Sequence, residues 1–236
     1  MKFKSLLLAT LAASALIGGS LLSNAQIAFT VDPGQNWAGY INAYETPANG
    51  GAYATGFVEG DVSTASANWA PGPSQPLTMS PNTRLYDDVL LDPYWVDQGT
   101  FIGNKVIEFD YYQEHIDDAQ IGQSVSFYFN PIANTLPAGY EAVGFIKVLD
   151  AFSSWATTQI VTTPLVAGQP TTLTLAEVLD PGAGTASVQA GFWVKGLAVS
   201  SSDPIASTGV QIVPEPTTLA LAGLGAAALL IFRRRS

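Results

Sequence analysis

Short runs of alternating apolar and polar residues, broken by frequent turn signals, restrict this chain to an all-β fold. In two of the clearest runs, 106–112 and 122–130, every second residue is a bulky apolar side chain. An alternation with a period of two is typical of a half-buried β-strand. Turn signals such as Asn49-Gly50-Gly51 separate the runs, and helical periodicity is almost absent. About nine to eleven short strands of this kind favour an antiparallel β-sandwich.

The predicted core consists of aromatic residues on the apolar faces of these runs. The run 140–149 is apolar on both faces apart from Glu141 and Lys147, which predicts a central strand. The aromatic residues expected in the core are Trp37, Phe109, Phe127, Phe129, Phe145 and Phe192.

The C-terminal stretch 213–236 differs sharply from the rest of the chain. The triplet Pro214-Glu215-Pro216 precedes an uncharged apolar run, Thr217–Phe232, and three arginines, Arg233, Arg234 and Arg235. As a helix, the apolar run would rise roughly 24 Å, a little short of the ~30 Å hydrocarbon core of a bilayer. A buried core helix is the alternative. Because the run lacks polar periodicity, it predicts a transmembrane helix with cytoplasmic arginines and everything before Pro214 outside.

The N-terminus predicts export. Lys2 and Lys4 form a positive region, Ser5–Ile17 is apolar, and Ser23-Asn24-Ala25 offers small residues for cleavage. This order is that of a secretory signal peptide. We expect a signal helix over 1–25, cut by signal peptidase between Ala25 and Gln26. A cut near Gly18-Gly19-Ser20 is the alternative.

Between the two signals lies a single predicted domain, 26–212, so that the chain divides into 1–25, 26–212 and 213–236. The middle part has a length that suits one β-sandwich. It holds four cationic and eighteen acidic residues, a formal charge of −14. This negative charge disfavours binding of nucleic acid, because proteins neutralise its phosphates with cationic side chains. It is compatible with binding of calcium. The chain has no cysteine, which excludes zinc–thiolate sites and cysteine nucleophiles.

The order of Pro-Glu-Pro triplet, hydrophobic helix and basic tail in 213–236 resembles the bacterial PEP-CTERM sorting signal. This resemblance implies recognition by an exosortase-like membrane protease. It also implies anchoring in the inner membrane before processing, followed by a location at the cell surface or in an exopolysaccharide matrix. Such signals follow many unrelated passenger domains, so they indicate a destination and no activity.

A second resemblance covers the start of the passenger. A Trp-x-x-Tyr-x-Asn-x-Tyr strand, an Asn-Gly-Gly turn and a Leu-Thr-Met-Ser-Pro-Asn segment are typical of one recurring PEP-CTERM passenger. This passenger type is similar to the jelly-roll β-sandwich of carbohydrate-binding modules, and it implies no assigned activity. The matching residues are Trp37, Tyr40, Asn42, Tyr44, 49–51 and 77–82.

Two sets of residues are candidates for binding. Exposed aromatic rings could stack on a sugar, and burial in the core is the alternative, which is favoured for Trp193 because Trp is usually highly buried. Carboxylates on the irregular loop 82–103 are the oxygen ligands that calcium prefers, although a solvated acidic loop is the favoured explanation for them. We expect no cofactor other than calcium. The aromatic candidates are Tyr40, Tyr44, Trp95 and Trp193, and the calcium candidates are Asp87, Asp88, Asp92 and Asp97.

Catalysis finds little support in the sequence. There is no Gly-x-Ser-x-Gly elbow, phosphate loop or dinucleotide fingerprint. His115 is the only histidine, and we expect it at the surface in a polar turn. We therefore expect a non-catalytic exported protein at the cell surface or in the exopolysaccharide matrix. The alternatives are a carbohydrate-binding module, a calcium-stabilised scaffold and a glycan-active hydrolase that uses two carboxylates.

Overall fold

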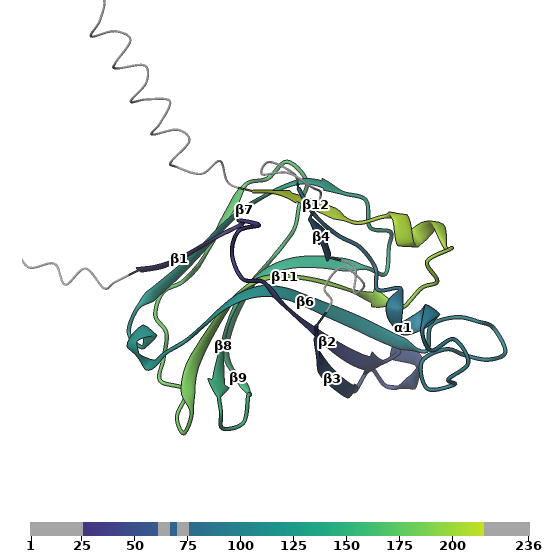
Figure 1. The fold of residues 1–236 in the computed structure, drawn as a ribbon, viewed down its shortest axis with the longest axis horizontal. Helices are drawn as coiled ribbons and strands as arrows, with labels where there is room; N and C mark the ends of the chain where they lie inside the picture. Colours follow the sequence, from purple (N-terminus) through teal and green to yellow (C-terminus); the bar gives the residue numbers. More distant parts are fainter. Residues whose placement is uncertain (1–25, 61–66, 70–75, 215–236) are drawn as a thin grey trace, which may run out of the picture.

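The computed structural model describes residues 26–60, 67–69 and 76–214, which form two packed β-sheets (Figure 1). The antiparallel β-sandwich predicted from the alternation is therefore confirmed. The signal helix and the transmembrane helix predicted at the two ends lie outside the described residues. Within the described ranges, no helix is long and apolar enough to cross a membrane.

Sheet I contains the long strands of the molecule, in the order β3-β2-β6-β11-β8-β9. All its neighbouring strands are antiparallel. In Figure 1 this sheet bends into an arch whose concave side faces away from the other sheet. Its strands are β3 (Tyr53–Glu59), β2 (Ala38–Glu45), β6 (Lys105–Ile116), β11 (Thr185–Leu197), β8 (Glu141–Ala151) and β9 (Thr157–Pro164).

Sheet II has the order β1-β7-β12-β5-β4, with β10 also paired to β7. Its strands are antiparallel except for β1, which runs parallel to β7 and so departs from the antiparallel pairing that the sequence predicts. Its strands are β1 (Gln26–Thr30), β7 (Ser124–Asn134), β12 (Val210–Val213), β5 (Leu77–Met79), β4 (Ala67–Trp69) and β10 (Thr171–Leu175).

Helical structure in the described residues is confined to four single turns. They lie in the connections between strands, and only α1 adds apolar residues to the main core, Leu85 and Tyr86. The turns are η1 (Pro47–Asn49), α1 (Arg84–Asp87), η2 (Asp118–Gln120) and η3 (Pro204–Ser207).

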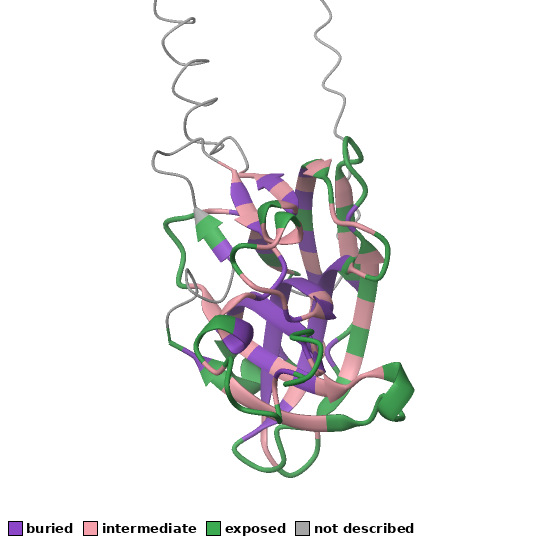
Figure 2. Cartoon of the chain, turned by 90° about the vertical axis from the view of Figure 1, so that its right-hand side faces the viewer, coloured by how far each residue is buried: buried purple, intermediate pink, exposed green. Residues whose placement is uncertain are grey.

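The main core lies between the two sheets and is rich in phenylalanine. Phe192 of sheet I contacts Phe127 and Phe129 of sheet II, with ring centroids 5.1 and 5.3 Å apart. Figure 2 shows the buried residues on the inner strands and the exposed ones in the loops. Phe109 is also buried here, as predicted, whereas Trp37 is only partly buried and stacks on Tyr111 at 4.8 Å.

A second, smaller apolar cluster lies on the concave side of sheet I. It consists of Tyr112, Val143, Phe145 and Trp193, with Ala38 and Tyr40 packed against it. Phe145 was predicted as a core residue and is fully buried, but it belongs to this second cluster. The outer face of sheet I is therefore partly apolar, which is unusual for a face that is not covered by another sheet.

Candidate functional site

A groove of about 650 Å³ lies on the concave face of sheet I. Residues from all six strands of the sheet line it, and Trp155 from the β8–β9 loop lies at one end. A concave site with apolar walls and a few polar groups is the usual form of a ligand site. The aromatic lining residues are Tyr40, Tyr53, Tyr112 and Trp155, and the polar ones include Asn42, Asp110, Glu114, Lys147 and Gln189.

Strand register explains why these residues share one face. Tyr40, Asp110 and Trp193 lie directly opposite one another on β2, β6 and β11. In the next row, Tyr112 faces Gly191. Because side chains alternate across a strand, residues 108, 110, 112 and 114 of β6 all point to the concave side. Glycine at 191 leaves this row without a side chain in the middle of the sheet.

A buried ion pair lies in the floor of the groove. Lys147 Nζ is 2.5 Å from Asp110 Oδ2 and lies 4.4 Å above the ring of Phe145. Asp110 Oδ1 is buried and has no hydrogen-bond partner in the described part of the chain. Burial raises the pKa of Asp110 to about 6, and the nearby Lys147 opposes this rise. Burial thus outweighs the attraction of Lys147 because a carboxylate loses its hydration there.

A second polar network adjoins this pair. Asn42 Nδ2 lies 3.3 Å from Glu108 Oε1 and 3.5 Å from Asp110 Oδ2, so it links the two carboxylates. Lys195 Nζ pairs with Glu108 Oε2 at 3.0 Å and lies 4.0 Å above the ring of Tyr44. Tyr44 donates its hydroxyl to Glu108 Oε1, and burial raises the pKa of Tyr44. These contacts hold Tyr44 in the network.

Glu114 lines the groove as a half-buried carboxylate. Its Oε1 accepts hydrogen bonds from Ser187 Oγ at 2.6 Å and from Gln189 Nε2 at 2.8 Å. None of the ion pairs in the described ranges includes Glu114. The groove therefore holds one balanced ion pair and one further negative charge.

The structure places the four aromatic candidates in different environments. Tyr40 lines the groove. Trp193 is only 9% exposed and stacks on Phe145 at 5.3 Å, and its Nε1 is buried without a hydrogen-bond partner among the described residues. Tyr44 is half-buried, and Trp95 packs against the main core. Sugar stacking by these four residues remains a prediction.

Three aromatic residues of the groove were not candidates from the sequence. The alternation already put Tyr112 on the outer face of its strand, and Tyr53 lies on the strand that returns after the Asn49-Gly50-Gly51 turn. These two strand positions are the sequence signal from which Tyr112 and Tyr53 could have been chosen as candidates. Trp155 carries no such signal because it lies in a loop whose path the sequence does not show.

The four aspartates of the 82–103 loop do not meet. Asp87 accepts from the backbone N–H of Ser201, and Asp88 pairs with Arg84 at 3.4 Å. Asp92 and Asp97 accept backbone N–H groups within their own turns, and for Asp97 these bonds lower its pKa. In the described part of the chain, no group of three or more acidic or histidine side chains could hold a metal ion. Calcium binding remains a prediction.

Most of the sorting residues lie outside the described ranges. Gln26, the expected first residue of the mature chain, begins β1, and Pro214 directly follows β12. Ala25, Glu215, Pro216 and Arg233, Arg234 and Arg235 are not described. The passenger is thus a β-sandwich with a concave groove, directly followed by the Pro-Glu-Pro triplet.

Comparison with known proteins identifies the C-terminal stretch. Residues 213–235 match the PEP-CTERM protein-sorting motif, so the resemblance noted above is confirmed. The motif marks an exported protein with a C-terminal membrane-anchoring signal that an exosortase-type system processes. No curated protein sequence matches the chain. A solved structure described as "CBM4 structure and function" is similar at 13% identity and a TM-score of 0.27, over 63% of this chain and 78% of that one.

Proposed function

We propose that this exported protein binds a neutral polysaccharide chain in the groove of sheet I, without catalysing a reaction. The observation that carries the proposal is the combination of aromatic walls and a polar floor in one groove on the concave sheet face. A sugar ring has hydroxyl groups around its edge and apolar C–H groups on its faces. Such a ligand needs both kinds of surface, and Tyr40 and Asn42 offer them side by side.

The polar groups of the groove suit hydroxyl groups. Asp110 Oδ1 is a buried acceptor without a partner in the described residues, and such an atom costs about 1–3 kcal/mol. A hydroxyl of a bound ligand would satisfy it. Asn42 and Gln189 each carry an amide that both donates and accepts hydrogen bonds. The floor therefore offers donors and acceptors together, as an uncharged polyhydroxylated ligand requires.

The charges of the groove favour a neutral chain over an acidic one. Lys147 is the single cation among the lining residues, and Asp110 already balances it. Glu114 adds a negative charge. Like charges across an interface disfavour binding, so polysaccharides rich in uronic acid should bind poorly. The strongly acidic passenger as a whole acts in the same direction.

The two carboxylates of the groove favour binding over hydrolysis. Asp110 and Glu114 lie four residues apart on β6, which separates their Cα atoms by roughly 13 Å. Glycosidases hold their carboxyl pair about 5–9.5 Å apart. Glu108 lies nearer to Asp110, but it pairs with Lys195 and does not line the groove. A non-catalytic role is therefore the better explanation of this arrangement.

The proposed destination follows from the sorting motif. Signal peptidase removes residues 1–25, and the C-terminal apolar segment 217–232 holds the protein in the inner membrane. An exosortase-like protease then acts at Pro214-Glu215-Pro216, and the passenger reaches the cell surface or the exopolysaccharide matrix. A groove for neutral polysaccharide would hold the passenger in such a matrix.

A glycan array probed with the full chain tests the proposed function. We expect signals from neutral oligosaccharides and their loss in a Tyr40→Ala variant. Tyr128→Ala is the matched control, because Tyr128 is an exposed tyrosine on β7 in the other sheet. An array without any neutral signal, or a Tyr40→Ala variant that binds like the wild type, would contradict the proposal. Release of reducing sugar would instead support the hydrolase alternative.

A further inference from the structure

Two exposed aromatic residues in the β8–β9 loop have an unusual backbone conformation. Phe152 and Trp155 have φ angles of +63° and +55°, in the left-handed region. Their side chains are 73% and 47% exposed. The two rings meet edge to face, with centroids 5.5 Å apart. We call these two residues the Phe152–Trp155 pair.

Positive φ angles are strained for bulky residues, and such strain is usually found at functional sites. Full burial does not compensate for it here, because Phe152 is largely in solvent and Trp155 is only half-buried. The loop is instead fixed by Asp150 at its base. The Asp150 carbonyl accepts the N–H of Trp155 at 2.8 Å, and its Oδ2 accepts Ser154 Oγ at 3.2 Å. The loop therefore holds two aromatic rings outward in a defined position.

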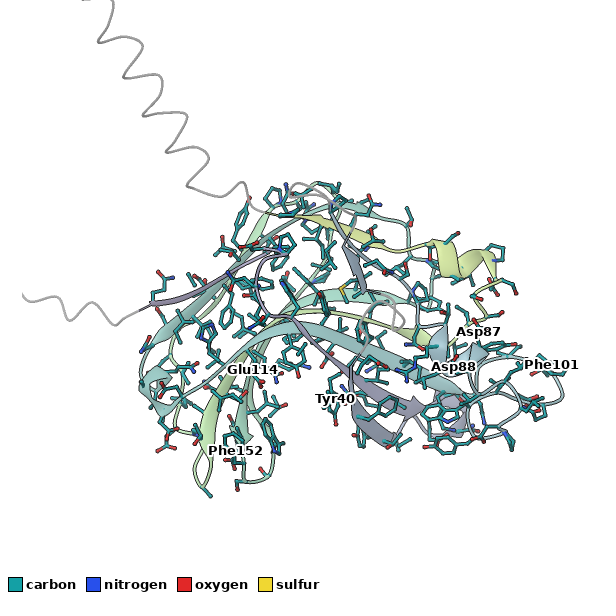
Figure 3. The ribbon with its side chains drawn as sticks, in the orientation of Figure 1. Tyr40, Asp87, Asp88, Phe101, Glu114 and Phe152 are labelled. Atoms are coloured by element: carbon teal, nitrogen blue, oxygen red, sulfur yellow. The ribbon has the colours of Figure 1, made fainter. Side chains whose placement is uncertain are left out.

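The Phe152–Trp155 pair lies at one end of the groove. Trp155 lines it beside Leu149 and Thr157, whereas Tyr40 lies on β2, on the far side of β6 and β11. Figure 3 shows Phe152 near the lower end of the molecule, Glu114 above it and Tyr40 further to the right on the concave side. Three strand spacings, about 14 Å, separate β8 from β2. The strand register adds an offset along the strands, because Leu149 lies six residues, or roughly 20 Å, from Val143 in the row of Tyr40. One sugar ring is too small to contact both ends.

We infer that Trp155 is a stacking platform for one sugar ring at the end of the groove, and that the ligand is an oligosaccharide chain running obliquely across the sheet. This inference rests on the proposed function and adds the direction and minimum length of the ligand. The chain would stack on Trp155 at one end and on Tyr40 at the other. Between them, its hydroxyls would meet Gln189 and Asp110.

Phe152 acts through Trp155. Its ring and the indole are nearly perpendicular, at 74°, and such an edge-to-face contact favours one orientation of the indole. Phe152 is therefore a positioning residue. Phe152→Ala should weaken binding less than Trp155→Ala does, and Phe152→Tyr should restore it because tyrosine keeps the ring.

Titration calorimetry with gluco- and manno-oligosaccharides tests the inference on the full chain, held in a detergent without a sugar headgroup. We expect Trp155→Ala and Trp155→Gly to weaken hexasaccharide binding at least about tenfold, the effect of losing one half-buried aromatic contact. Disaccharide binding should change little, because the Tyr40 end of the groove remains intact. Phe101→Ala is the matched control, since Phe101 has a φ of +54° and is 56% exposed but lies outside the groove.

Thermal melting separates loss of the ring from loss of the fold. Glycine tolerates a positive φ and alanine does not. Trp155→Gly should therefore melt about 2–4 °C above Trp155→Ala, although both lose the same hexasaccharide affinity. A binding defect that followed the melting temperature instead would overturn the inference.

Different results would overturn the role of Trp155 and the binding of polysaccharide in the groove. Hexasaccharide binding that Tyr40→Ala weakens and Trp155→Gly leaves unchanged would overturn the role of Trp155 and support the groove. Disaccharides that bind as tightly as hexasaccharides would overturn the predicted length. A wild-type chain that binds none of these sugars would overturn the proposed function itself.

Discussion

Asp110 of β6 and Trp193 of β11 face each other on adjacent strands, and each has a buried polar atom without a hydrogen-bond partner among the described residues. The atoms are Asp110 Oδ1 and Trp193 Nε1. Buried polar groups are nearly always hydrogen-bonded, so two exceptions in neighbouring positions need an explanation. Asp110 lines the groove, and a ligand or water there would satisfy its free oxygen.

The ion pair beneath the groove should be essential for stability. Lys147→Met removes the one cation that pairs with Asp110 among the described residues and leaves a buried carboxylate without a counter-charge. Breaking a buried pair typically costs about 3–5 kcal/mol. We expect a loss of this size in the free energy of unfolding, measured by urea denaturation of the exported protein at pH 8.

A double variant provides the control for this prediction. Lys147→Met combined with Asp110→Leu removes both charges and replaces them with apolar side chains of similar volume. It should recover most of the lost stability, because no unpaired charge remains. Equal stabilities of the single and double variants would show that Lys147 acts through packing alone.

Asp110 should also make stability depend on pH. Its folded-state pKa of about 6 lies above the ordinary value of 3.8. Between these values the folded protein binds more protons than the unfolded chain, so the free energy of unfolding falls as the pH rises. The expected fall is of the order of 2–3 kcal/mol.

Asp97 acts in the opposite direction because its pKa is lowered, so the comparison must isolate Asp110. The quantity to measure is the stability of the wild type relative to Asp110→Asn, by urea denaturation at pH 4, 5, 6 and 7. This difference should decrease with rising pH. A difference that stays constant or increases would show that Lys147 outweighs burial.

Phe192 should be the most sensitive position of the main core. It is fully buried and contacts two phenylalanines of the other sheet. Truncating a buried phenylalanine costs about 3–5 kcal/mol. We expect this loss for Phe192→Ala in urea denaturation, against less than about 1 kcal/mol for Tyr128→Ala at the surface. Similar losses for both variants would contradict the central position of Phe192.

The sorting motif predicts the fate of the C-terminus. In a host without an exosortase-type system, the chain should stay in the membrane at full length, because the apolar run 217–232 remains attached. Mass spectrometry of the membrane fraction would then detect peptides that contain Arg235. A soluble exported protein that retains Arg235 would contradict membrane anchoring by this segment.

The alternation in the sequence predicted the inner faces of the strands well. Ile107, Phe109 and Tyr111 of β6 face the core, as do Phe127 and Phe129 of β7. These residues are large and apolar, and burial of such side chains dominates folding. The period of two therefore carried enough information for the class of fold.

The outer face of sheet I was less predictable. The sequence put Asp110 and Glu108 on the outer face, and the structure shows them buried there. Their partners, Lys147 and Lys195, come from other strands, and their pairing depends on a register that the sequence does not show. The sequence also placed Trp193 correctly on this face. It did not show that Phe145 and Lys147, which come from another strand, pack against its ring.

The groove itself depends on features without a local sequence signal. Trp155 reaches it through a loop with positive φ angles at two aromatic residues, a conformation that such residues rarely adopt. The parallel pairing of β1 with β7 likewise joins segments that are far apart in the chain. The sequence therefore did not predict the long-range strand pairing or the conformation of this loop.

Affinity electrophoresis of the full chain tests the central claim most directly. Gels would contain a soluble neutral β-glucan, a neutral galactomannan or the acidic polysaccharide alginate, each at the same concentration and at pH 7. We predict that at least one neutral polysaccharide slows the wild type but not Tyr40→Ala, and that alginate slows neither. Retardation by alginate alone, or no retardation in any gel, would contradict a groove for neutral polysaccharide.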